Sequence, residues 1–283
     1  MLVLLTVIWG MTFPATKIAL QTTDPVTFLF LRFLVAGMVL LPYIAIRQFK
    51  RPRGTNPTRW GRGALVGLAL GIGFMLQTIG MRTTTASRSG FFTGLLVVFT
   101  PLLAILFNTS YVSRRVLIAI PPALMGIWLM SDPGGGGLNL GDWLTIFCAF
   151  VFAGQMILLE AMRFREDETW EIAFVQMAMV GLIAGGWLLW KNSQLLLSGV
   201  LLWTVLFNGL FGGIAAIWLQ TRYQPRVPAG YAALIFILEP LFAGTFAYLL
   251  LSDPWRLRSI GGAGLIITAM AIASIKANPV KAT

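Results

Sequence analysis

Long apolar blocks, separated by short polar segments, make up most of this chain. A block of about 20 apolar residues is long enough to cross the hydrocarbon core of a bilayer as a helix. Ten blocks meet or approach this length, at residues 2–20, 25–46, 63–82, 89–109, 115–130, 142–162, 171–190, 200–220, 228–251 and 258–276. The pattern therefore predicts an all-α integral membrane protein with ten transmembrane helices.

The composition agrees with this prediction and excludes several kinds of chemistry. Of the 283 residues, 57% are hydrophobic and only 11% are charged, which is far too apolar for a soluble domain. The chain has no histidine, and this excludes histidine-dependent metal sites and catalysis by Ser-His or Cys-His pairs. The single cysteine, Cys148, lies within an apolar block and cannot build a disulfide framework or a thiolate cluster. We expect no metal, no cofactor and no catalytic residue.

The net charge of +11 is explained by topology and does not indicate nucleic-acid binding, because the basic residues lie between apolar blocks. If the chain starts inside the cell, the cytoplasmic segments hold fourteen basic residues, at positions 47, 50, 51, 53, 59, 62, 114, 115, 163, 165, 222, 226, 276 and 281. The opposite segments hold five, at positions 82, 88, 191, 256 and 258. Basic loops favour the cytoplasm, so we predict that both termini are cytoplasmic. A site for anionic lipids in these clusters is the alternative.

A glycine-rich segment at residues 131–141 divides the chain into two halves, and we interpret it as a flexible linker. The halves are residues 1–130 and 142–276, followed by a tail at 277–283. Three pairs of short segments match between them in the same order: 9–13 with 152–156, 76–78 with 219–221, and 100–102 with 239–241. This indicates a five-helix repeat. Because five is odd, the second copy enters the membrane in the opposite sense, and such inverted repeats are typical of secondary transporters.

An acidic residue lies inside one of the apolar blocks, directly before a proline. Residues 232–251 are otherwise apolar but contain Glu239 and Pro240. A carboxylate at the bilayer centre costs about 3 kcal/mol, so it should face protein or water. The proline bends the helix by removing one backbone donor. Glu239 either contacts a solute ammonium or takes up a proton, or it is a structural partner of this bend. The matching segment has Thr100 and Pro101, and threonine cannot ionise.

Several motifs resemble those of the EamA-type, ten-helix members of the drug/metabolite transporter superfamily. They are Trp9-Gly10 followed by Phe13, the segment from Phe28 to Phe33, the run TTASRSGFFTGLLVVFTP from Thr84 to Pro101, and the segment from Ala229 to Pro240. The resemblance covers essentially the whole chain and is closest to bacterial exporters of amino acids and other metabolites. It implies that spans one, three, four, six, eight and nine surround a central cavity that opens alternately to each side of the membrane.

Aromatic and amide side chains near mid-span are the candidates for lining this cavity. Trp9 and Phe13 lie four residues apart on one helix face, and Phe152 and Gln155 lie at the equivalent depth in the second half. Aromatic rings with a few polar groups suit amphipathic solutes, including aromatic ones, although such stripes also serve in plain packing. The candidate lining residues are Trp9, Phe13, Gln77, Thr100, Phe152, Gln155, Phe236 and Glu239, with Pro101, Pro240 and Gln220 at helix bends or gates.

Other polar residues have two interpretations each. Gln77 and Gln220 either line opposite gates or form hydrogen bonds between helices. Arg32 either meets a solute carboxylate or extends its long side chain to the outer interface, and we expect the latter or a structural pairing. The acidic residues at 166–168 and 171 are expected to form a solvated cluster that faces the arginines at positions 163 and 165.

The sequence therefore predicts a secondary transporter in a bacterial cytoplasmic (inner) membrane. We expect it to export amino acids, including aromatic ones, or related metabolites by alternating access, either coupled to protons or as a facilitator. The alternatives are a facilitator or importer of another class, such as nucleotide sugars or drugs, and a polytopic lipid-modifying enzyme. No nucleotide-binding motif is present. The expected partners are a small-molecule substrate and the lipid bilayer, with no nucleic acid. We expect a monomer, with a homodimer as the alternative.

Overall fold

The computed structural model describes residues 1–52, 54, 56–84, 86–109, 112–131, 137–191, 199–251 and 257–274, and all regular structure in this part of the chain is helical. In chain order the elements are α1 (Leu2–Ala19), α2 (Pro25–Phe49), α3 (Trp60–Gly80), α4 (Ala86–Gly94), α5 (Leu96–Leu106), α6 (Arg114–Ser131), α7 (Leu140–Ala161), η1 (Glu166–Glu168), α8 (Thr169–Lys191), α9 (Gly199–Phe207), η2 (Asn208–Ala215), α10 (Ala216–Tyr223), η3 (Gln224–Arg226), α11 (Ala229–Phe236), α12 (Glu239–Leu251) and α13 (Leu257–Ser274). Of these, η2 is a π-helix, and η1 and η3 are short 3₁₀ turns.

Eight helical segments of the described residues are long and apolar enough to cross a membrane: Leu2–Ala19, Pro25–Phe49, Trp60–Gly80, Ser89–Leu106, Leu140–Ala161, Glu166–Trp190, Gly199–Arg226 and Ala229–Phe246. They coincide with eight of the predicted blocks. The other two blocks contain α6 and α13, which are helical but lie outside this set. Residues 132–136 of the predicted linker and the whole tail at 277–283 lie outside the described residues.

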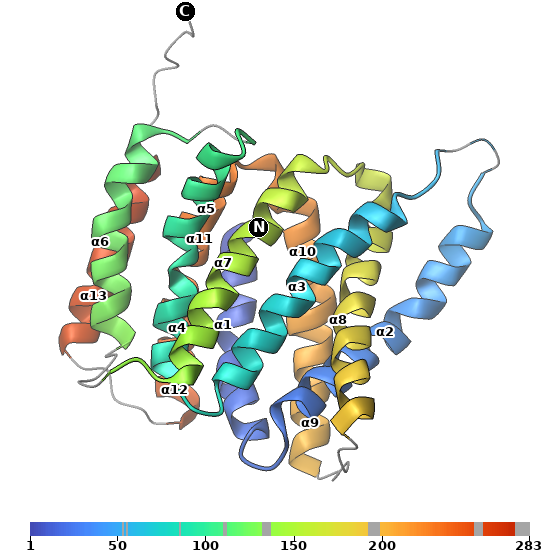
Figure 1. Cartoon of the computed structure of the whole chain (residues 1–283), viewed down its shortest axis with the longest axis horizontal. Coiled ribbons are helices and arrows are strands. Elements are labelled where there is room, and N and C mark those ends of the chain that lie inside the picture. Colours follow the sequence, from blue (N-terminus) through green and yellow to red (C-terminus); the bar gives the residue numbers. More distant parts are fainter. Residues whose placement is uncertain are drawn as a thin grey trace, which may run out of the picture.

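The helices lie side by side, with α6 and α13 at one edge of the molecule and the tilted α2 at the other (Figure 1). The most extensive helix contacts are between α6 and α13, between α3 and its two neighbours α7 and α8, between α2 and α8, and between α1 and α12. Segments from the two halves of the chain are thus packed directly against each other. The site described below lies among these contacts between the halves.

Local sequence signals define where two of these helices begin. Asp24 precedes α2, and its carboxylate accepts hydrogen bonds from the backbone N–H groups of Val26 and Thr27, with Pro25 at the first helical position. Asn139 and Asp142 form a capping box at the start of α7. Both arrangements satisfy backbone donors that have no partner within the helix.

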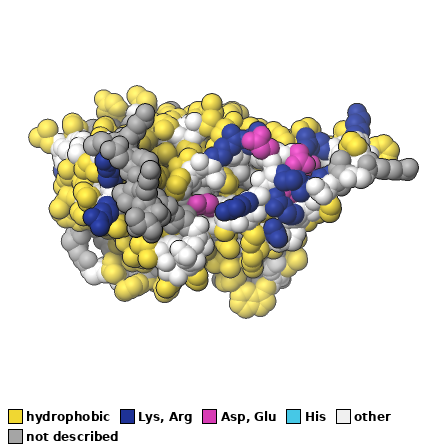
Figure 2. All heavy atoms as spheres, turned by 90° about the horizontal axis from the view of Figure 1, so that it is seen from above, with side chains coloured by type: hydrophobic (Ala, Val, Ile, Leu, Met, Phe, Trp, Pro, Cys, Tyr) yellow, Lys and Arg dark blue, Asp and Glu magenta, His cyan; other side chains and the backbone are white. Residues whose placement is uncertain are grey.

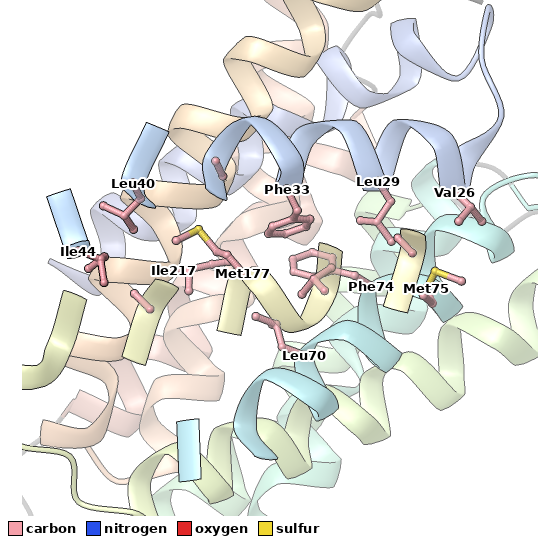
Figure 3. Packing of buried hydrophobic residues seen from close by; sticks show 14 residues of the cluster. Val26, Leu29, Phe33, Leu40, Ile44, Leu70, Phe74, Met75, Met177 and Ile217 are labelled. Carbon is pink, nitrogen blue, oxygen red and sulfur yellow. The ribbon is translucent and has the colours of Figure 1, made fainter. Parts of the chain in front are cut away.

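The largest buried apolar cluster joins α2, α3 and α8. Figure 3 shows Leu29 and Phe33 of α2 packed with Leu70 and Phe74 of α3 and with Met177 of α8. The four-residue spacing of Gly63, Gly67 and Gly71 predicts close helix packing, and these glycines face α8. A Cβ at Gly67 would lie only 2.7 Å from the Cα of Gln176, so the two backbones approach each other as small residues allow.

Three of the membrane-length segments are interrupted. The break between α4 and α5 is at Leu95, and the break between α11 and α12 is at Ile237 and Leu238. The third segment changes from α-helix to the π-helix η2 and back. Prolines lie near only some of these places: Pro240 is the second residue after its break, whereas α5 runs on through Pro101.

One face of the molecule, which we call the charged face, carries Arg47, Arg51, Arg59, Arg165, Glu166, Asp167, Glu168, Glu171, Arg222 and Arg226. Figure 2 shows basic and acidic side chains gathered together on the face seen from above. The predicted acidic cluster does face Arg165, which pairs with Asp167 and Glu168, but the prediction that it is solvated is wrong for Glu168 and Glu171. The side chains of Glu168 and Glu171 are 0% and 3% exposed, and they pair with Arg59 and Arg47. Long-range folding brings the end of α2, with Arg47, and the residue before α3, Arg59, onto these carboxylates and buries them.

Candidate functional site

A cavity of about 70 Å³ lies in the interior of the helix assembly. It is lined by Trp9, Thr12, Phe13, Thr16, Arg32, Leu70, Phe74, Gln77, Thr78, Met81, Thr93, Leu96, Phe152, Gln155, Met156, Gln220, Phe236 and Glu239. These residues come from both halves of the chain. A space of this size holds a few water molecules, so a larger solute requires the surrounding helices to separate. Of the candidate residues, Thr100, Pro101 and Pro240 are not part of this lining.

Aromatic rings form much of the wall. The Trp9 and Phe236 rings pack edge to face with centroids 5.4 Å apart, and so do Phe74 and Phe152, also at 5.4 Å. These are favourable geometries for aromatic pairs. The indole N–H of Trp9 is buried, and within the described residues it has no hydrogen-bond partner. This aromatic part of the wall is therefore apolar apart from the Trp9 N–H, which among the described residues is left free to bond a solute.

The Trp9-Gly10 motif has a packing explanation. A Cβ at Gly10 would lie 2.6 Å from the Cβ of Phe242 and 2.9 Å from the backbone nitrogen of Ala243. Only glycine allows α1 and α12 to approach this closely. The close approach keeps Trp9 of α1 near the start of α12, where Glu239 lies.

A chain of buried amides runs through the second half of the molecule. Gln220 donates to the Gln155 Oε1 at 3.2 Å, Gln155 donates to the Gln176 Oε1 at 3.3 Å, and Gln176 donates to the Thr221 Oγ1 at 2.9 Å. The chain connects α10, α7 and α8. Separately, Gln77 donates to the Thr93 Oγ1 at 3.1 Å. The sequence reasoning missed Gln176, although a glutamine within an apolar block is the same signal that identified Gln77.

Glu239 is the first residue of α12, directly after the helix break. At the break, Leu238 N–H bonds to the Ile235 carbonyl at 3.1 Å and Phe242 N–H bonds to the Leu238 carbonyl at 3.0 Å. A carboxylate at a helix N-terminus is favoured by the helix dipole. Within the described part of the chain, the Glu239 carboxylate has no hydrogen-bond or ion-pair partner. Glu239 therefore lines the cavity, and among the described residues its carboxylate forms no hydrogen bond that would stabilise the helix bend.

Arg32 does not extend to the outer interface as predicted. The residue is 6% exposed, and its guanidinium lies over two rings, 4.8 Å from the centroid of Phe33 and 5.0 Å from that of Phe74. It lines the cavity. The packed rings hold the side chain inward, and this orientation cannot be derived from the depth of Arg32 along its helix.

Thr100 lies away from the cavity. It is fully buried, and its hydroxyl oxygen has no hydrogen-bond partner among the described residues. The break in its segment is at Leu95, so Leu96 lines the cavity instead, whereas Thr100 and Pro101 lie further along α5. The two halves therefore differ in how far the break lies from the proline.

A second, larger cavity of about 650 Å³ lies at the charged face. It is lined by Thr109, Glu160, Ala161, Arg163, Phe164, Glu166, Thr169, Thr221, Arg222, Pro225 and Arg226. Gln220 lines the inner cavity and the adjacent Thr221 lines this one, so α10 borders both. The amide chain that ends at Thr221 lies between the two spaces.

In the part of the chain that the structure describes, no group of three or more histidine, cysteine, aspartate or glutamate side chains is arranged to hold a metal ion. The inner cavity instead offers one acid, one guanidinium, amides and aromatic rings. This set can recognise a small organic solute by charge, hydrogen bonds and ring contacts.

The fold and this interior cavity define a polytopic helical membrane protein with a polar and aromatic site between its helices. The model of the EamA-like transporter family matches residues 1–132 and 139–275. The chain belongs to the EamA-like transporter family, which agrees with the resemblance of its motifs, and it is a membrane transporter.

Relatives with transporter names match over most of their length. A protein of Archaeoglobus fulgidus named as an uncharacterized transporter is 28% identical over 97% of this chain and 85% of its own length. The uncharacterized transporter YvbV of Bacillus subtilis is 26% identical over 100% and 93%. The uncharacterized inner membrane transporter YedA of Escherichia coli is 29% identical over 80% and 75%. One crystal structure has the same fold at 13% identity, with a TM-score of 0.78 over 99% of this chain and 98% of that one.

Proposed function

We propose that this protein is a secondary transporter that exports amino acids, including aromatic ones, or related metabolites by alternating access. The observation that carries the proposal is the interior cavity, where an unpaired carboxylate, Glu239, lies at a helix break among aromatic and amide side chains. A carboxylate at membrane depth is characteristic of solute and proton pathways. Interrupted helices at such sites are a recurring feature of secondary transporters.

We further propose ten spans arranged as two inverted five-helix repeats. The two parts matched by the family model, residues 1–132 and 139–275, agree with the two halves proposed from the sequence. Each half contains a corresponding broken segment near the cavity, between α4 and α5 in the first and between α11 and α12 in the second, and the second half adds the π-helix η2. Gln77 and Gln220, at matching positions of the halves, both line the cavity.

The amide chain supports a gate between the two cavities. Gln155 and Gln220 line the inner cavity, and Thr221 lines the larger cavity at the charged face. The buried Gln176 side chain is hydrogen-bonded both to Gln155 and to Thr221. A solute that passes between the cavities must break these hydrogen bonds. Because each bond between neutral groups contributes only about 1 kcal/mol net, a layer of this kind can open and close reversibly. In this proposal the charged face is the side from which the solute enters.

The decisive experiment is counterflow of labelled amino acids in proteoliposomes, with and without an imposed pH gradient. Counterflow needs a working carrier cycle but no net driving force, so it reports transport directly. Wild type is compared with Glu239→Gln, which keeps the size of the side chain and removes its charge. Asp167→Asn is the matched control, because Asp167 is 60% exposed on the charged face, away from the cavity.

We expect counterflow in wild type and in Asp167→Asn. If a pH gradient drives uptake in these two proteins but not in Glu239→Gln, Glu239 belongs to the coupling pathway. If the gradient has no effect and Glu239→Gln still exchanges, the protein is a facilitator and Glu239 is a structural partner of the bend. Absence of counterflow for every amino acid would refute the amino-acid proposal.

A further inference from the structure

Arg32 is a buried cation in the membrane interior that lacks an anionic partner. It is 6% exposed, and its Nε has no hydrogen-bond partner. Across the described residues its contacts are with the rings of Phe33 and Phe74, and no carboxylate pairs with it. Ring faces attract a cation but do not replace an anion that accepts hydrogen bonds. A buried charge left unpaired is strongly unfavourable, so the site is incomplete as it stands.

The surrounding helices fix the guanidinium at the cavity. A Cβ at Gly212 of the π-helix η2 would lie 3.5 Å from the Arg32 Nη2, and a Cβ at Gly209 would lie 2.8 Å from the Arg32 carbonyl oxygen. Glycine at position 209 lets η2 pack directly against the backbone of α2, whereas the close contact at Gly212 is with Thr12 of α1, at 2.8 Å, and leaves the guanidinium in ordinary van der Waals contact. Irregular π segments occur often at functional sites. Together with the two rings, this packing keeps Arg32 from reaching the membrane surface.

The same cavity contains one acid, Glu239, which comes from the other half of the chain. Arg32 and Glu239 both line it, yet within the described residues they form no ion pair with each other. One separate cation and one separate anion complement a solute that carries both charges. The aromatic wall of Trp9 and Phe236 adds an apolar surface for the rest of such a solute.

We propose that Arg32 binds the carboxylate of a zwitterionic solute while Glu239 faces its ammonium group. Arginine presents a planar pair of N–H donors that matches a carboxylate in a bidentate manner. A carboxylate fits better than a phosphate, because a doubly charged group would leave a net negative charge beside Glu239. This inference rests on the proposed transport function and adds to it the residue that selects solutes with a free carboxylate.

The test measures selectivity, because a purely structural role for Arg32 would change amount or stability and leave selectivity unchanged. Counterflow of labelled L-phenylalanine is competed with unlabelled L-phenylalanine and with L-phenylalaninamide, which retains the ring and the amine but not the carboxylate. Other amino acids of the same panel are each competed with their own amide. The variants are Arg32→Gln and Arg32→Lys. Arg82→Gln is the control, since the Arg82 side chain is 59% exposed and pairs with Asp24.

In wild type and Arg82→Gln, we expect the amide to compete at least about 10-fold less well than the free acid. In Arg32→Gln, acid and amide should compete about equally. Arg32→Lys keeps the charge but loses the bidentate geometry, so it should retain a reduced preference for the acid. If Arg32→Gln does not fold, the acid-to-amide preference of Arg32→Lys alone tests the inference.

Failure of this inference can be distinguished from failure of the proposed function. If wild type exchanges amino acids but does not distinguish acid from amide, or if the Arg32 variants keep the wild-type ratio, the role of Arg32 is refuted while transport stands. If wild type exchanges no amino acid of the panel, the proposed function falls and this inference falls with it.

Discussion

At the scale of single residues, burial decides how much each acid of the charged face contributes to stability. Glu168 has a 0% exposed side chain and accepts hydrogen bonds from the Arg59 Nε at 2.7 Å and from the backbone N–H groups of Arg59 and Arg165 at 3.1 and 2.9 Å. Its neighbour Asp167 is 60% exposed. Water screens the exposed ion pairs of Asp167 but not the buried ion pair between Glu168 and Arg59.

We predict that Glu168→Ala lowers the free energy of unfolding by about 3 kcal/mol, because it removes the charged partner of Arg59 and leaves the Arg59 Nε and two backbone N–H groups without their acceptor. Asp167→Ala should cost less than about 1 kcal/mol. Thermal unfolding of the purified protein in detergent measures both, with the drop in midpoint much larger for Glu168→Ala. Equal drops for the two variants would show that Glu168 is hydrated in the same way as its neighbour.

The residue scale also shows what a sequence can predict. Spacing along a helix gives the depth of a side chain in the membrane, and depth was the basis for choosing Trp9, Gln77 and Glu239, all of which line the inner cavity. Depth does not give direction. Arg32 is long enough to reach the interface from its position, and its contacts with the rings of Phe33 and Phe74 and with η2 hold it inward.

At the scale of helices, glycines on one face of α3 control its packing on α8. A Cβ at Gly67 would lie 2.7 Å from the Cα of Gln176, so the backbones themselves would have to separate. Gly61 lies on the same helix, is exposed, and has nothing within 4 Å of the position that a Cβ would take. The two positions therefore provide a matched pair for substitution.

Gly67→Ala is expected to destabilise the protein by about 2 kcal/mol through overpacking. Gly61→Ala should be neutral or slightly stabilising, because alanine has the higher helix propensity. Unfolding midpoints in detergent compare the two directly. Because Gln176 belongs to the amide chain, Gly67→Ala should also slow counterflow beyond what its stability loss explains. A Gly67→Ala protein as stable as wild type would mean that α3 and α8 are less closely packed than described.

Helix breaks were only partly predictable. Proline removes a backbone donor and so weakens the preceding turn, and the break at Ile237 and Leu238 lies in the turn before Pro240. The corresponding break near Pro101 is displaced to Leu95, and the π-helix η2 contains no proline. The positions of these breaks depend on which helix packs against the broken segment. Gly209 of η2, for example, packs against Arg32 of α2, and such partners lie far apart in the sequence.

At the scale of the whole molecule, the remaining question is which face lies in the cytoplasm. The charged face carries the ends of α2, α7 and α10, and its basic residues exceed its acidic ones. Much of this charge is paired: Arg47 and Arg59, for example, bond to Glu171 and Glu168. The positive-inside rule counts basic residues regardless of acidic neighbours. We therefore predict that the charged face is cytoplasmic, together with the N-terminus.

Cysteine labelling tests this orientation. Cys148 is buried, and replacing it with alanine gives a background without thiols. Asn56→Cys then places an exposed thiol at the charged face, and Gln21→Cys places one in the connection between α1 and α2, at the opposite end of α2. A membrane-impermeant maleimide should label Gln21→Cys in intact cells and Asn56→Cys only in inside-out vesicles. The reverse pattern would place the charged face outside, and the amide chain between the two cavities would then close the outer side of the transporter.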